Sequence, residues 1–231
     1  MQNSNVKTRL IVLSFLQFAV WGAYLTSMGR YLGNAGMGSD IGWFYSVQGI
    51  VSIFMPALIG IIADRWVPAQ RMLSFCHAVA AVFMGITGYI GMTKGADVVF
   101  GDLFWTYTIS VAFYMPTLAL SNSVSYSVLN QAGLDTVKAF PPIRVFGTVG
   151  FIVSMWIVDL TGFQNDYSQF FASAVWGVLL AAYSLTLPNC PVDKSAEKKS
   201  LASAFGLDAF KLLGQRRMAL FFIFSMLLGA A

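Results

Sequence analysis

One stretch of the sequence places an arginine, a threonine and a phenylalanine on the same face of a helix. Arg144, Thr148 and Phe151 are four and then three residues apart, which is the spacing of neighbours along a helix face. Together they offer a forked cation donor, a hydroxyl and a flat aromatic ring, a set that suits a ligand with a planar ring and carbonyl or hydroxyl groups. Gly147 and Gly150 lie on a different face, where they allow a neighbouring helix to approach. Spacing alone also permits another interpretation, in which Arg144 only anchors a helix end and Phe151 faces lipid.

Three further polar side chains lie within apolar stretches and are weaker candidates for binding. Gln17 and Asn122 are amides, which either contact a ligand or bridge two helices. His77 is the only histidine, and we favour a hydrogen-bonded packing role for it over proton relay. No carboxylate lies deep in a complete apolar stretch, so the sequence indicates no proton site inside these helices.

The elements that must position these residues are membrane helices. Hydrophobic residues make up 57% of the chain and charged residues only 10%, whereas soluble domains carry about 25% charged residues. Apolar runs of about 20 residues match the thickness of a bilayer. The sequence predicts an all-α membrane protein with six complete spans and a seventh that begins near Met218. The six spans are Leu10–Leu32, Ile41–Ala63, Met72–Met92, Val98–Ser121 (extending toward Leu129 in a longer version), Val145–Thr161 and Gln169–Leu187.

The basic residues are concentrated on one side of the predicted membrane topology. Of the 14 Lys and Arg residues, only Arg30 and Lys94 fall outside the N-terminus and the loops on its side. The positive-inside rule therefore predicts a cytoplasmic N-terminus. The same bias explains the net charge of +4 without a nucleic-acid partner.

The longest polar stretch separates two predicted membrane regions. We expect a six-helix bundle over 1–187, a cytoplasmic linker over 188–217 and the start of a second bundle over 218–231. Part of the linker fits an amphipathic helix, with Leu201, Phe205, Phe210 and Leu213 on one face. The final run of about 14 apolar residues is too short to cross a membrane alone. This layout resembles the N-terminal half of a major facilitator superfamily transporter, so we expect a C-terminal half as its partner.

A short segment at the end of the second span resembles the loop signature of the same superfamily. Gly60 is followed four residues later by Asp64 and then by Arg65. A glycine permits close helix approach, and the acid–base pair can latch helices that rock against each other. The segment departs from the pattern at residues 67–69, and an ordinary solvated loop is the alternative interpretation.

Several stretches, spread in order along nearly the whole chain, resemble those of the bacterial nucleoside:proton symporters. They are Ser14–Phe18 with Trp21 and Gly22, Phe54–Leu58, Tyr114–Leu118, Phe140–Arg144 with Gly147 and Thr148, and Phe221–Gly229. The resemblance implies a proton-coupled nucleoside importer of the inner membrane, working by alternating access, with the proton as coupling ion and no cofactor. It implies that Arg144, Thr148 and Phe151 belong to the nucleoside site. It also implies that the carboxylates handling the proton lie in the seventh helix and beyond.

Other functions are possible from the residues alone. A facilitator transporter of a sugar or another small polar metabolite would use the same arginine–aromatic face. A membrane enzyme is disfavoured because the sequence contains no HExxH, GxSxG, paired cysteines or phosphate-binding loop. A non-transporting six-helix scaffold requires that the natural chain end at Ala231. The sequence does not distinguish purine from pyrimidine nucleosides.

Overall fold

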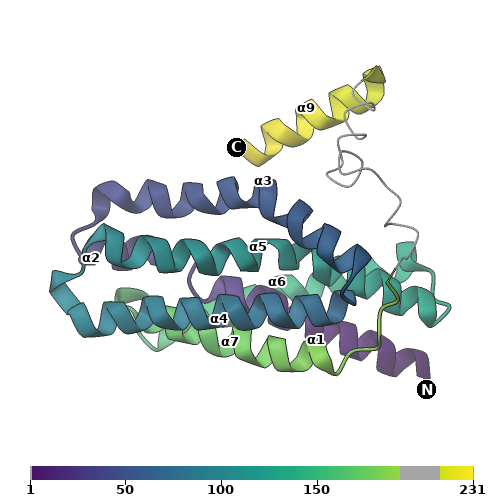
Figure 1. Ribbon diagram of the computed structural model, residues 1–231, viewed down its shortest axis with the longest axis horizontal. Coiled ribbons are helices and arrows are strands. Elements are labelled where there is room, and N and C mark those ends of the chain that lie inside the picture. Colours follow the sequence, from purple (N-terminus) through teal and green to yellow (C-terminus); the bar gives the residue numbers. More distant parts are fainter. Residues whose placement is uncertain (1, 193–213, 231) are drawn as a thin grey trace. The chain divides into compact units, whose positions relative to one another are not determined.

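The computed structural model describes residues 2–192 and 214–230, and these residues are helical apart from short turns and connections. The chain divides into two compact units, Met1–Val192 and Asp193–Ala231 (Figure 1). The first unit contains the helices α1 Gln2–Gly22, α2 Met28–Asn34, α3 Ile41–Arg65, α4 Ala69–Lys94, α5 Phe100–Gln131, α6 Thr136–Leu160 and α7 Ser168–Leu185. Three short 3-10 helices connect them, η1 Gly38–Asp40, η2 Gly95–Asp97 and η3 Phe163–Asn165.

Five of these helices are long and apolar enough to cross a membrane, namely α3, α4, α5, α6 and α7. The prediction of an all-α, multi-pass membrane protein is confirmed. The helix α5 reaches Gln131, so the longer version of the fourth span is the correct one.

The first predicted span, Leu10–Leu32, is wrong as a single helix. The helix α1 ends at Gly22, and a break separates it from α2, which begins at Met28. A Cβ atom on Gly22 would overlap the backbone of α6. Within the break, the carbonyl of Leu25 accepts a hydrogen bond from the Tyr45 hydroxyl at 2.8 Å. Ala23, Tyr24 and Leu25 continue the apolar run of α1 into the break, so hydropathy does not reveal the interruption.

The predicted start of the fifth span at Val145 is also wrong. The helix α6 begins nine residues earlier, at Thr136, and includes Pro141 and Pro142. The Asp135 carboxylate caps it by accepting from the backbone N–H groups two and three residues later, at 3.0 and 3.4 Å. Each proline removes one helical hydrogen bond. Both lie in the second turn, close to the helix end, where water can satisfy the released carbonyls.

The helices of the first unit pack in a few close pairs. The helix α1 packs mainly on α6 and also on α7, α4 packs on α5 and α7, and α3 packs on α5. Glycines bring two of these pairs together. A Cβ atom on Gly150 of α6 would overlap the Phe15 carbonyl of α1, and one on Gly177 of α7 would lie 2.9 Å from the Ala81 Cβ of α4. Small residues at such contacts allow membrane helices to pack closely.

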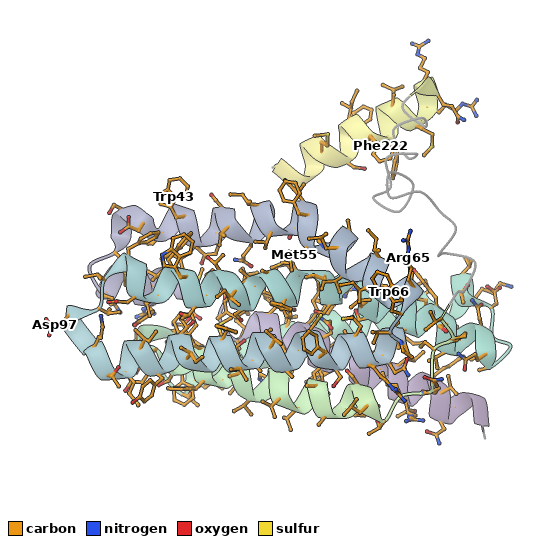
Figure 2. All side chains as sticks on the ribbon, in the orientation of Figure 1. Trp43, Met55, Arg65, Trp66, Asp97 and Phe222 are labelled. Atoms are coloured by element: carbon orange, nitrogen blue, oxygen red, sulfur yellow. The ribbon has the colours of Figure 1, made fainter. Side chains whose placement is uncertain are left out.

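The first unit has two apolar clusters, one toward each end of the bundle. One cluster includes Leu10, Leu73, Leu129 and Leu180, and the other includes Tyr24, Phe44, Tyr107 and Phe170. Large exposed tryptophans lie near both ends. Figure 2 shows Trp43 near the end that holds Asp97 and Trp66 near the end that holds Arg65; both indoles are more than half exposed. Exposed indoles at two levels are typical of the aromatic belts of a membrane protein.

The second unit is described only over residues 214–230. Its helix α9 spans Arg216–Ala230, so it begins two residues before the seventh span expected from Met218. The predicted amphipathic face of the linker, Leu201, Phe205, Phe210 and Leu213, lies outside the described residues.

Candidate functional site

Arg144 lies well inside α6 and not at its end. It is eight residues beyond Thr136, which corresponds to about 12 Å along the helix axis. Its guanidinium carbon is 3.8 Å from the centroid of the Phe18 ring of α1, a cation–π contact. The side chain is half-buried, and within residues 2–192 it makes no hydrogen bond or ion pair. A half-buried guanidinium with its N–H donors unused is well placed to bind a polar ligand.

Gly147 makes room for this contact. A Cβ atom there would lie 2.7 Å from a guanidinium nitrogen of Arg144 and 2.7 Å from the ring of Phe18. The glycine therefore lets the guanidinium approach the ring to 3.8 Å while α1 and α6 remain close.

An aromatic wall continues from Phe18 along α1 and α6. The Trp21 ring lies 6.3 Å from the Phe18 ring and meets the Phe151 ring edge-to-face, also at 6.3 Å between centroids. The Trp21 ring also packs against the Tyr114 ring of α5, with centroids 6.2 Å apart. The indole N–H of Trp21 donates to the Gln48 side-chain oxygen at 3.1 Å, which fixes the orientation of the ring. Phe151 is half-buried, so part of its surface remains available to a ligand.

Thr148 lies on α6 and Asn122 lies on α5. Thr148 is exposed one turn after Arg144, and Asn122 is half-buried on α5. Neither side chain forms a hydrogen bond with the described residues. The rings of Tyr126 and Phe140 join α5 to α6, with centroids 4.6 Å apart. Asn122 is one turn from Tyr126 on α5, and Arg144 is one turn from Phe140 on α6, in both cases toward the middle of the bundle. Asn122 and Arg144 therefore lie at a similar depth in the bundle.

Gln17 is placed differently, because it is fully buried and both atoms of its side-chain amide are hydrogen-bonded. Its amide nitrogen donates to the Thr117 hydroxyl at 2.8 Å, and its amide oxygen lies 3.0 Å from His77 Nε2. The Tyr114 hydroxyl donates to the Gln17 backbone carbonyl at 2.8 Å. We call Gln17, His77, Tyr114 and Thr117 the Gln17 network. The structure does not bring Gln17 together with Arg144, Thr148 and Phe151, which we call the α6 face.

The directions of these hydrogen bonds fix the role of His77. Because the Gln17 nitrogen donates to Thr117, its oxygen is the acceptor, and His77 Nε2 must carry the hydrogen. The ring also packs against Tyr114, with centroids 5.8 Å apart. This geometry supports the packing role favoured for the histidine.

Comparisons with known proteins identify the family of this chain. Residues 4–231 match the family model described as nucleoside H+ symporter. The chain belongs to the nucleoside H+ symporter family. It is 47% identical to the xanthosine permease of Escherichia coli strain K12 and 43% identical to the nucleoside permease NupG of the same strain, over 98% of this chain in each case. A crystal structure of the nucleoside transporter NupG superimposes with a TM-score of 0.80 at 43% identity, and that of a mutant form with 0.85.

The family is one of transporters and not of enzymes, which confirms that expectation. The chain spans about half the length of the curated relatives it matches, 53% of each permease. It covers 55% of the NupG chain in the crystal structures. These matches confirm the predicted resemblance and the facilitator-type N-terminal bundle.

The Gly60 segment of this symporter-family chain lies at the end of α3. Gly60 is partly exposed, and a Cβ atom there would meet nothing within 4 Å. Asp64 is exposed in the last turn of α3, followed by the half-exposed Arg65. The structure brings the three residues together at the end of α3.

Phe18 is the residue of this site that spacing arguments missed, since only the family resemblance included it. Ser14, Phe18 and Trp21 on α1 follow the same spacing of four and then three residues as the α6 face. Two helix faces with the same spacing, on helices that pack against each other, would have indicated a site formed by both. The sequence does not show that α1 packs on α6, so this signal could not be used.

Proposed function

We propose that this chain is the N-terminal half of a proton-coupled nucleoside importer that works by alternating access. The family supports the class of transporter. The observation that carries the proposal is the half-buried guanidinium of Arg144, which lies over the Phe18 ring and has no polar partner among the described residues. Maintaining such a group inside a membrane protein is costly and marks a functional site.

The chemistry of the α6 face fits a nucleoside. The base is planar and aromatic and stacks on the partly open Phe151 ring, while Arg144 and Thr148 donate to its carbonyl groups or to ribose hydroxyls. Asn122 supplies a further donor and acceptor from α5. A sugar or other polar metabolite is the alternative, but the aromatic wall favours a ligand with a flat ring over one with hydroxyl groups alone.

Proton coupling in this proposal depends on the other half of the transporter. The aspartates of the described spans all lie at helix ends, so the carboxylates that bind the proton belong to the C-terminal half. The proton is the only coupling ion, and no cofactor is required. The protein resides in the bacterial inner membrane with its N-terminus in the cytoplasm, as the basic loops favour.

The same proposal includes a latch at the cytoplasmic end of α3. The open space beside Gly60 leaves room for a helix of the C-terminal half. Asp64 and Arg65 would hold that helix in one conformation and release it in the other.

Uptake of labelled uridine and adenosine by transport-deficient cells tests the proposal. Cells expressing the full-length transporter should accumulate nucleoside, and a protonophore should abolish the accumulation. Arg144→Ala should reduce uptake to background while leaving the amount of protein in the membrane unchanged. Excess ribose should compete poorly with uridine.

The outcomes separate the parts of the proposal. Normal expression without nucleoside uptake would reject the substrate. Uptake that resists the protonophore would reject proton coupling, and strong competition by ribose would favour the sugar alternative.

A further inference from the structure

A polar cavity lies at the opposite end of the bundle from the N-terminus. Its volume is about 360 Å³, and its walls come from the break between α1 and α2, from α2, from the end of α6 and from η3. The walls include Thr26, Arg30, Met155, Trp156, Asp159 and Gln164. The cavity is at the external end of the bundle if the N-terminus is cytoplasmic.

The cavity continues the α6 face toward that end. Met155 and Asp159 follow Phe151 at intervals of four residues, so they extend the stripe formed by Arg144, Thr148 and Phe151 on the same side of the helix. Asp159 is eight residues beyond Phe151, or about 12 Å along the helix axis. A ligand that moves from the external surface to the α6 face along α6 therefore passes this cavity.

The polar groups of the cavity are incompletely paired. Gln164 donates from its side-chain nitrogen to the Asp159 carboxylate at 3.0 Å, but its side-chain oxygen is buried without a hydrogen-bond partner. Arg30 forms no ion pair with Asp159 or with any other residue of the described range. Buried acceptors without partners are uncommon in folded proteins, and such an acceptor invites a donor from a ligand or from water.

The walls indicate the chemical class of the ligand. One cation and one carboxylate face the same space, so their charges balance and a neutral ligand is preferred to an ion. Arg30 supplies donors for a carbonyl group, while Asp159 and Gln164 supply acceptors for hydroxyl groups. Trp156 adds an aromatic surface at the rim, and the volume lies within the range of small-molecule pockets, about 300–1,000 Å³.

We propose that this cavity is an external entry site, which binds a nucleoside before it moves along α6 to Arg144. The proposal rests on the proposed function for the identity of the ligand. The ribose hydroxyls bind Asp159 and the Gln164 oxygen, and the base lies toward Arg30 and Trp156. Occupation of the entry site raises the local concentration of substrate at the mouth of the pathway, which favours uptake at low external concentration.

Protection of an engineered cysteine against labelling tests the site separately from transport. Thr26→Cys places a thiol in the cavity wall, and the native cysteines Cys76 and Cys190 are buried. The variant is made in full-length transporter that also carries Arg144→Ala, which removes binding at the α6 face. External uridine at ten times its dissociation constant should slow labelling by a membrane-impermeant maleimide about tenfold. Ser39→Cys, exposed at the same end but outside the cavity, should label at a rate that uridine does not change.

Uptake kinetics provide the second measurement. Asp159→Asn and Arg30→Gln should each raise the KM for uridine about 3- to 10-fold, which is the effect of losing one or two hydrogen bonds. The maximal rate of uptake at saturating uridine should change little. Asp97→Asn is the matched control, because Asp97 is exposed at the same end and lies outside the cavity.

The results distinguish the two proposals. If wild-type protein transports uridine but the cysteine is not protected and the KM values are unchanged, the entry site is rejected and the proposed function stands. If wild-type protein transports no nucleoside and uridine gives no protection, the nucleoside is wrong at both sites. Protection without nucleoside uptake would retain the entry site and reject the transport function.

Discussion

The two sides of α1 handle polar groups in opposite ways. On one side, Gln17 is fully buried and its amide is paired with Thr117 and His77. On the other side, Phe18 holds the guanidinium of Arg144, whose hydrogen-bond donors have no partner in the described part of the chain. Such a network connects helices, because both atoms of the Gln17 amide have partners on other helices. A group with unused donors at a partly open surface is available to a ligand.

The largest effect is expected on the open side of α1, for Arg144→Lys. Lysine keeps the charge but cannot present two parallel N–H groups or stack flat on Phe18. Hydrogen bonds to charged groups contribute about 1.5–3 kcal/mol, so the KM for uridine should rise about 10- to 100-fold. The thermal unfolding temperature of the purified transporter should not change. A fall in stability with unchanged KM would assign Arg144 to packing and would break the contrast between the two sides.

The glycines that join α1 to α6 should separate packing from binding. Gly150→Ala would force a methyl group into the Phe15 carbonyl, so stability should fall by about 1–3 kcal/mol. The new methyl group of Gly147→Ala would meet only side-chain atoms, including those of Arg144 and Phe18. These side chains can move aside, so the free energy of unfolding should change little, whereas the displaced Arg144 should reduce nucleoside uptake.

Gly85→Ala is the control for these two variants, because its new methyl group would make an ordinary contact at 3.8 Å. Thermal unfolding and uptake should be measured together for all three proteins. Equal losses of stability in the Gly147 and Gly150 variants would contradict the expectation that a methyl group against side chains costs less than one against the backbone.

On the closed side, Gln17→Leu should reduce stability without weakening binding. The change removes the partners of His77 and Thr117, and an unpaired buried polar group costs about 1–3 kcal/mol. Adding Thr117→Val should cost less than the sum of the single effects, because the two residues share one hydrogen bond. Unfolding of the single and double variants measures this coupling, and the KM per folded molecule should stay close to wild type. A strongly raised KM for Gln17→Leu would place Gln17 in the substrate site.

The smallest effect concerns a cysteine outside the spans. Cys190 follows α7, and its backbone N–H donates to the Gln70 side-chain oxygen at 3.0 Å. Burial raises the pKa of the Cys190 thiol above its ordinary value, so little reactive thiolate forms near neutral pH. Iodoacetamide should modify it slowly in the folded protein and rapidly after denaturation. Rapid modification under native conditions would show that the segment after α7 opens readily.

The sequence was sufficient for the class of fold, and it supplied the residues of the site that we propose. Long apolar runs and biased basic loops identify membrane helices because the bilayer sets their length and charge distribution. The helix period alone placed Arg144, Thr148 and Phe151 on one face. The break after Gly22 could not be foreseen, because residues buried by neighbouring helices are as apolar as residues that face lipid.

The start of α6 was missed for a different reason. Consecutive prolines usually end a helix, but Pro141 and Pro142 lie inside α6 near its cytoplasmic end. The earlier start places Arg144 within the bundle, which disfavours the interpretation that it only anchors a helix end. The contrast between Gln17 and Asn122 was also not predictable, because both are single amides in apolar surroundings and only their partners across the bundle distinguish them.

The most direct test of the central claim is uridine binding to the purified full-length transporter, measured by calorimetry for wild type, Arg144→Ala and Gln17→Leu. We predict saturable binding to wild type, loss of the binding at the α6 face in Arg144→Ala so that only the separate binding at the entry site remains, and near-normal affinity for the folded fraction of Gln17→Leu. Binding to Arg144→Ala with wild-type affinity would contradict the assignment of the nucleoside site to the α6 face.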